Sequence, residues 1–519
     1  MASCTSFFQS SDFKSPYISL EVGVVSRKEG ATPVSGLDFD VEKGSVLSIS
    51  SQENIASTTD RHCLETLLKL HPLPMPKHDR RIYSILFFCS TYRLGFVAIA
   101  IANLSFLAVS SRSHSSPTIH LTAYIASIAT AANIFVAILA RNDHLINFWF
   151  KSAILVSRFA PLSIRLLAAR VYSYGGIHTG CATASVAWFV ALVAMLTIQA
   201  RDKPTGSSIA AATIAYTILV LLISIMTLAL PTMRERFHNT FELSHRFLGW
   251  SVLILLWGSI PVSTFSALRS EESLSHALLV HPASWLLLTT TLLVIYPWIY
   301  LRRRAVKTTV LSPHALKLTF NHGPAPPCSG IKLSLNPLIE THAMAAIPHS
   351  PIRTITGYRK AKGFDLIVSN AGDWTKALIE NPPERIWLRG LPAIGMMHVA
   401  LSFRRVVLVV TGSGIAPILG LFSDPTRTTF NARIVWSTRS PVKTYGEEVV
   451  RMVKRADPEA VIVDTSVVGR WDLVALAYSM YFETKAEVVL VMSNGKVTPA
   501  IVRALRSRSV PAMGPIFDS

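Results

Sequence analysis

Charged residues are scarce in this chain, and acidic residues are scarcer than basic ones. Asp, Glu, Lys and Arg make up 16% of the 519 residues, against roughly 25% in a typical soluble domain, and half of the chain is hydrophobic. Lys and Arg number 50 and Asp and Glu 31, which gives a formal net charge of +19. The basic residues lie in short loops between apolar runs. This distribution excludes a nucleic-acid-binding protein and indicates an integral membrane protein.

Cysteine is rare and never closely spaced. The five cysteines are far apart, and no pair forms a CxxC motif. This spacing excludes an iron–sulfur cluster, a zinc site and a disulfide framework. Residues 1–60 contain no apolar core of the length that a signal peptide needs, so we expect the first membrane span to serve as its own insertion signal.

Six apolar runs are long enough to cross a hydrocarbon layer of about 30 Å. They predict spans near residues 84–109, 119–140, 177–198, 209–230, 246–263 and 283–301. The stretch 145–170 is less apolar and carries four basic residues, so we expect it to lie at the membrane interface. Arg93 falls inside the first run. It is either a buried functional charge or a sign that the span starts at Leu94.

The loops of this membrane region differ in charge. Basic residues cluster before the first run, after the second, between the fourth and fifth and after the last, whereas loops 110–118 and 264–282 carry few. Lys and Arg concentrate on the cytosolic side of a membrane protein, so the pattern predicts cytosolic N- and C-termini. The loop at 199–208, with Arg201 and Lys203, fits this pattern least well.

The chain divides into four expected regions. Residues 1–80 are expected to be a disordered polar tail that contains one short amphipathic helix at 62–71, and residues 81–304 a transmembrane helical domain. Short strands over 305–395 predict a β-barrel-like domain. Strands that alternate with helices over 396–519 predict a parallel sheet in an α/β domain.

A glycine-rich segment follows the buried strand expected at 404–410 and precedes a helix. Glycines let the backbone approach a pyrophosphate, and the helix N-terminus offers N–H groups to the anion. The candidate nucleotide-binding residues in this segment are Thr411, Gly412, Ser413, Gly414 and Pro417. A tight turn that binds no ligand is the alternative.

Arg439 lies just past the next expected strand. At that place a guanidinium can pair with a 2′-phosphate and select NADPH over NADH. The alternative is a solvated loop charge.

A second turn leads into a helix at Gly372-Asp373-Trp374-Thr375. A threonine near a helix N-terminus, together with unpaired N–H groups, makes a plausible phosphate site. An ordinary capped helix start explains the same residues.

Two histidines, His178 and His245, lie at the start of the third and fifth apolar runs, near their cytosolic ends. A neutral imidazole in a membrane span is a natural axial ligand for haem iron. The alternative is a pair of interfacial histidines that are hydrogen-bonded to their neighbours.

Together these segments resemble the ferric reductase / NADPH oxidase superfamily of transmembrane flavocytochromes over residues 80–519. The run GDWTKAL is similar to the superfamily's GxWT stretch beside the flavin pyrophosphate, and GSGIAP is similar to its GxGxxP nicotinamide motif. Thr341-His342-Ala343-Met344-Ala345 lies where the family has its His-Pro-Phe-Thr/Ser flavin motif, and Arg389-Gly390-Leu391-Pro392 is similar to its GPxG segment. The closing VPAMGPIFDS resembles a fungal branch of ferric-reductase-like membrane proteins, some of them fused to adenylate-forming enzymes of secondary metabolism.

The resemblance implies a multi-pass helical domain followed by a ferredoxin-reductase-like flavin β-barrel and a nucleotide-binding α/β domain. It implies FAD near His342 and near Gly372 to Thr375, NADPH or NADH at the glycine-rich segment, and haem b between His178 and His245.

The sequence departs from the superfamily at three places. The positions for a second histidine on each helix hold Ala191 or Leu192 and Gly258 or Ser259, which leaves one haem. The flavin motif lacks its proline and its hydroxyl-bearing residue. A late Cys-Gly motif is replaced by Met492-Ser493-Asn494-Gly495.

We therefore expect a membrane-bound oxidoreductase that passes electrons from NAD(P)H through FAD, and through a single haem, to an unidentified acceptor in fungal secondary metabolism or signalling. No catalytic residue is assigned. The alternative is a non-catalytic membrane protein that keeps the reductase fold for signalling or scaffolding, and flavin absorbance would separate the two. A transporter is disfavoured because polar residues inside the spans are sparse.

Overall fold

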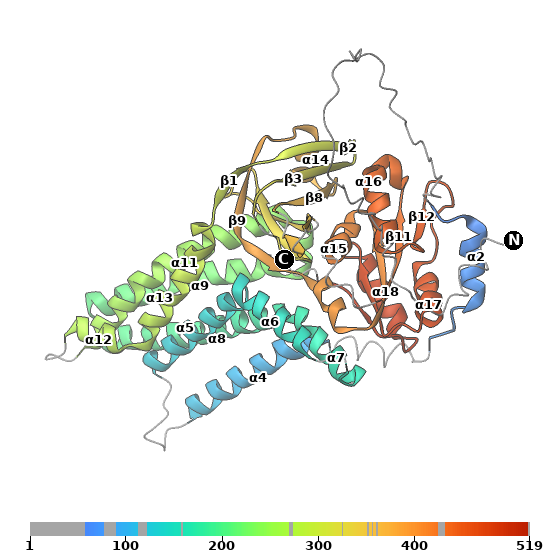
Figure 1. Ribbon diagram of the computed structural model, residues 1–519. Helices are drawn as coiled ribbons and strands as arrows, with labels where there is room; N and C mark the ends of the chain where they lie inside the picture. The colour runs from blue at the N-terminus through green and yellow to red at the C-terminus, as the bar shows by residue number, and fades with distance from the viewer. Residues whose placement is uncertain are drawn as a thin grey trace, which may run out of the picture.

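The computed structural model describes residues 58–76, 90–112, 122–156, 159–268, 273–323, 325–349, 352–354, 357–359, 362–423 and 431–516. A helical bundle, an antiparallel sheet and an α/β domain follow one another along the chain (Figure 1). Residues 1–57, most of the expected polar tail, lie outside the described residues.

Apolar helices occur at all six places where the sequence predicts spans. They are α4 (Thr91–Arg112), α5 (Ala123–Leu139), α8 (Gly175–Asp202), α9 (Gly206–Ala229), α11 (His238–Ala267) and α13 (Pro282–Ile299). Five are long and apolar enough to cross a membrane. The sixth span would be α5 together with α6 (Asp143–Leu155), which continues it after a bend of 65°. The helix α4 begins before Leu94, so Arg93 lies in its first turn.

The bundle is held by packing between neighbouring helices and by a small polar network. The helix α8 packs against α4, α5 and α9, while α9 packs against α11 (Figure 1). The side-chain oxygen of Asn103 on α4 accepts hydrogen bonds from Asn133 on α5 at 2.8 Å and from Trp188 on α8 at 3.0 Å. These bonds satisfy polar groups in an apolar layer and link three helices.

The connections are shorter helices: α7 (Leu162–Ala168), η1 (Ala169–Ser173), α10 (Pro231–Arg236) and α12 (Leu274–Val280). The expected interfacial stretch 145–170 therefore comprises α6, α7 and the start of η1. We expected this stretch to lie at the membrane interface. Instead, Ile146 and Phe150 of α6 are buried against other parts of the protein.

The antiparallel sheet curls around its own core of alternating buried residues. Its strands are β1 (Arg302–Ala305), β2 (Lys307–Ser312), β3 (Ala315–Phe320), β4 (Ser329–Ser334), β5 (His342–Pro348), β8 (Phe364–Ser369) and β9 (Arg385–Ile394), in the order β1-β9-β4-β5-β8-β3-β2. The helix α14 (Asp373–Glu380) joins β8 to β9, and β6 (Ile352–Thr354) pairs with β7 (Gly357–Arg359). The domain starts slightly earlier than expected, because Arg302 to Arg304 pair with β9.

The C-terminal domain is the parallel α/β sheet that the sequence predicts. Its strands are β10 (Arg405–Thr411), β11 (Asn431–Thr438), β12 (Val461–Asp464), β13 (Val488–Met492) and β14 (Ala512–Met513), in the order β12-β11-β10-β13-β14. The helices are η2 (Met396–Ser402), η3 (Gly412–Gly414), α15 (Ile415–Leu421), α16 (Pro441–Ala456), α17 (Leu473–Glu483) and α18 (Val497–Arg506). The continuous burial of β10 and β13 explains their runs of valine and leucine.

The structure corrects the tail expected over 1–80 at its C-terminal part. Residues 61–70 form the expected amphipathic helix, α2 (Arg61–Leu70), and this helix docks on α17 of the distant α/β domain (Figure 1). Leu64 and Leu67 are buried there, and Thr59 exchanges two hydrogen bonds with Ile462 on the edge strand β12. Pairing with a distant sheet edge is not visible in a local pattern.

The helix α6 fastens the bundle to the antiparallel sheet. Asn147 donates to the carbonyl of Pro392 at 2.9 Å and accepts from the amide of Ile394 at 2.7 Å, as a neighbouring strand would. One turn earlier, Asp143 pairs with Lys332 at 2.7 Å. Gly390 is required beside it, because its φ is +69° and a Cβ would lie 2.8 Å from the Asp143 carboxylate.

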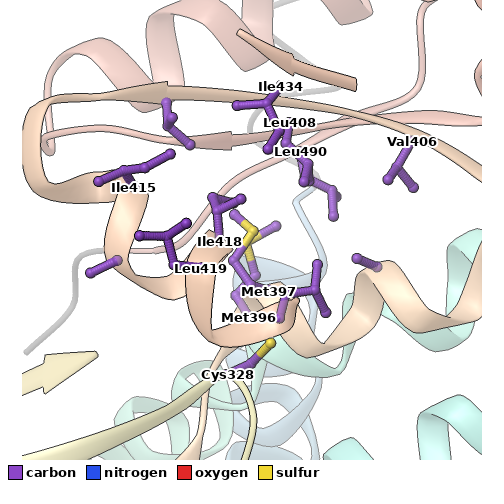
Figure 2. Packing of buried hydrophobic residues seen from close by; sticks show 14 of the residues in the cluster. Cys328, Met396, Met397, Val406, Leu408, Ile415, Ile418, Leu419, Ile434 and Leu490 are labelled. Atoms are coloured by element: carbon purple, nitrogen blue, oxygen red, sulfur yellow. The ribbon is translucent and has the colours of Figure 1, made fainter. Parts of the chain in front are cut away.

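One apolar core is shared by all three parts of the molecule. It combines residues of α6 with Cys328 of the antiparallel domain and with η2, β10 and α15 of the α/β domain. Figure 2 shows Met396 and Met397 between Cys328 on one side and Ile418 and Leu419 on the other. Movement of one part would expose this apolar surface, so the three parts are held in one arrangement.

A buried ion pair reinforces this arrangement. Arg165 of α7 donates two hydrogen bonds of 2.8 Å to the carboxylate of Glu487, just before β13. Burial by itself would raise the pKa of Glu487, but the hydrogen bond from Arg165 and the amide of Arg404 lower it. The carboxylate is therefore held in its charged form.

We expect Arg165→Ala to destabilise the protein by about 3 kcal/mol, because it removes a buried guanidinium and leaves a partly buried carboxylate without its charged partner. Thermal unfolding of the purified full chain in detergent measures the effect. The exposed Arg170→Ala, in the same connection, is the control and should change little. Equal effects of the two variants would contradict the role of the ion pair.

Candidate functional site

The glycine-rich loop lies at the reversal point of the parallel sheet. From the central strand β10 the chain runs outward to β11 and β12 and then returns to β13 on the other side of β10. In open α/β sheets, ligands bind at the carboxyl ends of the strands where the winding reverses. The loop after β10 and the loop after β13 both lie at this place.

Two glycines of this loop are required by its conformation. Gly412 has a φ of +53°, which other residues rarely adopt, and a Cβ at Gly414 would lie 2.7 Å from the carbonyl oxygen of Met492. The indole N–H of Trp436 donates to the carbonyl of Gly412 at 2.9 Å. The loop is therefore held from both neighbouring strands, and Ser413 lies between its two glycines. Pro417 is in the first turn of α15.

The loop after β13 is joined to the glycine-rich loop. The hydroxyl groups of Thr411 and Ser493 are 2.5 Å apart, and the amide of Ser493 donates to Thr498 at 3.0 Å. The segment that replaces the superfamily's Cys-Gly motif thus lies directly beside the candidate nucleotide loop.

Arg439 follows β11 at the same edge of the sheet and is exposed. Its carbonyl accepts from Thr444, and the next residue, Ser440, donates its amide to Asp464 at 2.9 Å. Burial would raise the pKa of Asp464, but hydrogen bonds from Ser466 and Ser440 lower it. The backbone beside Arg439 is fixed, while its guanidinium extends into solvent. This placement is compatible with both a phosphate partner and a solvated charge.

The expected flavin residues His342 and Trp374 lie together, although 32 positions separate them in the sequence. Their rings stack with centres 4.2 Å apart. Glu340 binds both, since it accepts from the Trp374 indole at 2.7 Å and lies 3.0 Å from Nε2 of His342. Burial would raise the pKa of Glu340, but these side-chain bonds and the amide of Leu335 lower it.

The turn before α14 is a capped helix start with open space beside it. The hydroxyl of Thr375 accepts from the amides of Ala371 and Gly372, at 2.8 and 3.0 Å, and donates to the carbonyl of Gly372. Thr375 therefore has a structural role. A Cβ at Gly372 would meet nothing within 4 Å, so the surface in front of the helix is open. Asp373 is the first residue of the helix.

The strand that carries the candidate flavin residue His342 is in contact with the helix that follows the glycine-rich loop. The helix α15, which follows the glycine-rich loop, packs against β5, which begins at His342. The approach is close enough that a Cβ at Gly420 would lie 2.5 Å from the carbonyl oxygen of Ala346. The hydroxyl groups of Ser369 and Tyr445 add a polar contact of 3.2 Å between the two domains.

His178 and His245 face one another in the bundle. Their ring centres are 6.4 Å apart, and Nδ1 of His178 is 2.9 Å from the carbonyl oxygen of Ala137. A carbonyl only accepts, so this bond puts the proton on Nδ1 and leaves Nε2 free of one. His178 is half-buried and His245 is exposed.

Sequence reasoning missed Glu340, which orients two of the predicted site residues. A signal was present, because Glu340 and His342 are two positions apart at the start of a strand, a spacing that puts side chains on one side. It also missed Asp143 and Asn147. Their partners on β9 are more than 200 positions away, so no local pattern reveals them.

Comparison with known proteins finds a family model that is similar to the C-terminal domain. Residues 396–519 match the family described as adenylate-forming reductase 03009, C-terminal domain. Two relatives from Coprinopsis cinerea match a longer part of the chain. Adenylate-forming reductase 03009 is 38% identical over 390 residues, and adenylate-forming reductase 06235 is 36% identical over 389 residues. Each match covers 75% of this chain and 37% of the relative. The chain therefore spans just over a third of the length of these proteins.

Solved structures resemble the chain more distantly. A ferredoxin NADP+ reductase from Neisseria gonorrhoeae with bound FAD and NADP is 11% identical, with a TM-score of 0.32, over 41% of this chain and 98% of that one. A flavohemoglobin from Malassezia yamatoensis with bound FAD and heme is 14% identical, with a TM-score of 0.35, over 64% of this chain and 97% of that one.

These comparisons agree with one part of the sequence-based resemblance. The relatives are fungal adenylate-forming reductases, and the fungal branch named above includes proteins fused to adenylate-forming enzymes. The wider resemblance to ferric reductases and NADPH oxidases stays a prediction.

We expect Gly414→Ala to disturb the α/β domain, because its new Cβ would collide with the Met492 carbonyl. Gly372→Ala should leave folding intact, because its Cβ would enter open space. Limited proteolysis and thermal unfolding of both variants test this contrast. Equal protease sensitivity of the two variants would contradict the geometry of the loop.

Proposed function

We propose that this protein is a membrane-bound oxidoreductase that passes electrons from NAD(P)H to FAD and then to an acceptor reached through the helical bundle. The observation that carries the proposal is the contact between α15 and β5. It brings the domain with the candidate nicotinamide loop against the strand with the candidate flavin residue, and hydride transfer needs its two partners side by side.

The antiparallel domain has features that fit a flavin dinucleotide. The stacked rings of His342 and Trp374 offer a flat surface whose orientation Glu340 fixes. The open space before Gly372 leaves room for a phosphate at the N-terminus of α14, where the helix dipole favours negative charge. FAD, when bound, supplies the exchange between a hydride and single electrons. The chain's own residues bind, orient and exclude water.

The α/β domain fits a nicotinamide nucleotide at the reversal point of the sheet. Gly412 and Gly414 let the backbone approach a pyrophosphate, and Ser493 holds the facing loop in place through Thr411. Arg439, at the next strand end, would pair with a 2′-phosphate. This arrangement favours NADPH over NADH.

The two histidines fit one haem. Their ring centres lie 6.4 Å apart, and these two residues would hold the haem iron. The bond from His178 Nδ1 to a backbone carbonyl is the usual support of a metal-binding histidine. Haem, when bound, supplies a one-electron carrier.

We propose one haem rather than two. Leu192 is buried where a further ligand would be needed, and so is Ser259. Both line a cavity of only about 30 Å³ between the helices. Electrons would therefore reach an acceptor from the cytosolic side or within the bundle. We place both termini in the cytosol, from the charge of the loops.

NADPH should reduce FAD bound to the purified protein in a stopped-flow experiment, and Arg439→Ala should lower the preference for NADPH over NADH. Loss of a hydrogen bond to a charged group, roughly 1.5–3 kcal/mol, corresponds to about a 10- to 100-fold change. Arg451→Ala, an exposed arginine of the same domain, is the control. If neither nucleotide reduces the flavin, the proposed function is wrong.

His245→Ala should abolish haem binding, because one axial ligand is lost, and the wild type should bind one haem per chain. A pyridine haemochrome assay measures both. His276→Ala, on the exposed helix α12, should retain haem. Haem retained in His245→Ala, or two haems in the wild type, would contradict the assignment.

Membrane topology can be tested with single cysteines in a variant whose own cysteines are replaced. Ser273→Cys, between α11 and α13, should react with an impermeant reagent from outside. His314→Cys, in the turn between β2 and β3, should react only after permeabilisation. The reverse pattern would invert the proposed orientation.

A further inference from the structure

Two arginines lie where the antiparallel domain contacts the helical bundle, and both bond to the short segment 338–341. Arg389 of β9 lies over the ring of Trp298, with 4.3 Å from its guanidinium carbon to the ring centre. Arg246 of α11 is the residue after the candidate haem ligand His245, and it donates to the carbonyl of Leu338 at 2.7 Å. Arg389 also donates to the hydroxyl of Thr341, next to His342, at 3.4 Å.

Neither guanidinium forms an ion pair with a carboxylate among the described residues. The nearby acids have other partners. Asp143 pairs with Lys332, Glu242 lies 3.4 Å from His238, and Glu340 is bound by His342 and Trp374. Positive charge at this junction is therefore not neutralised by direct contact.

The junction is unfavourable for two cations. Burial, followed by repulsion from Arg246, lowers the pKa of Arg389 to about 10, and attraction to Asp143 only partly opposes this. The Nε group of Arg389 is buried and has no hydrogen-bond partner within the part of the chain that the structure describes. A buried donor without a partner and two repelling charges both cost stability, which a bound anion would restore.

We propose that Arg246 and Arg389 form a binding site for a carboxylate or phosphate group at the junction between β9 and the cytosolic ends of α11 and α13. A guanidinium offers a planar set of donors that matches such oxyanions. The site lies between the candidate flavin and haem residues. The anion can belong to a haem propionate, to the FAD diphosphate or to a phospholipid headgroup. The first two sources rest on the proposed function, and the third does not.

The test compares the purified full chain with Arg389→Met, Arg389→Lys and Arg246→Met. Each preparation is assayed for haem by pyridine haemochrome, for FAD by fluorescence after release and for bound phospholipid by native mass spectrometry. Arg302→Met is the matched control, since Arg302 is exposed and its guanidinium donates to the carbonyls of Ile299 and Leu301.

We expect one of the three contents to fall by about tenfold in Arg389→Met and to fall also in Arg246→Met, a factor that corresponds to 1.4 kcal/mol. Arg389→Lys keeps the charge but loses the planar donors, so it should show a smaller loss and serves where the methionine variant fails to fold. The content that falls identifies the anion.

Wild-type contents of haem, FAD and phospholipid in both methionine variants would overturn the proposal, as would an equal loss in Arg302→Met. A wild-type protein without haem and FAD would refute the proposed function. In that case the phospholipid content of the wild-type protein would still test the anion site. If the wild type contained none of the three ligands, the anion site would be overturned as well.

Discussion

The arrangement of this protein depends on one short helix, α6. It leaves the apolar bundle at a bend of 65° and contacts both domains that follow. Asn147 bonds to the backbone of β9 as a neighbouring strand would, while Ile146 and Phe150 enter the core that the α/β domain also uses. The helix α6 thus satisfies polar backbone groups of β9 on one side and buries apolar surface in the shared core on the other.

The contacts of α6 with the two following domains fix the relative positions of the candidate site residues. His245 belongs to the bundle, His342 to the antiparallel sheet and Gly412 to the parallel sheet, so each lies in a different unit. The shared core and the pair of Arg165 with Glu487 keep the units from moving apart. The proposed electron transfer would need such fixed spacing between carriers, and packing between the units would supply it.

Much of the fold was accessible from pattern alone. Valine-rich runs at 405–411 and 488–492 predicted buried parallel strands, and apolar runs of sufficient length predicted the helices α4, α5, α8, α9, α11 and α13. Of the candidate sites, the loop from Thr411 to Pro417 was predicted with its context, because a strand, a glycine turn and a helix are adjacent in sequence. The dual role of Glu340 and the docking of α2 on α17 were not predicted, because they join distant segments.

By itself the sequence determined the order of the three units, the element types and the glycine positions, since these follow from local periodicity and backbone conformation. Only the tertiary structure decided that His342 stacks on Trp374, that Thr375 caps its own helix and that Arg389 lies over Trp298. The physical reason is that such contacts depend on how separate units pack. Packing depends on how whole surfaces fit together, and the spacing of residues within one segment does not reveal it.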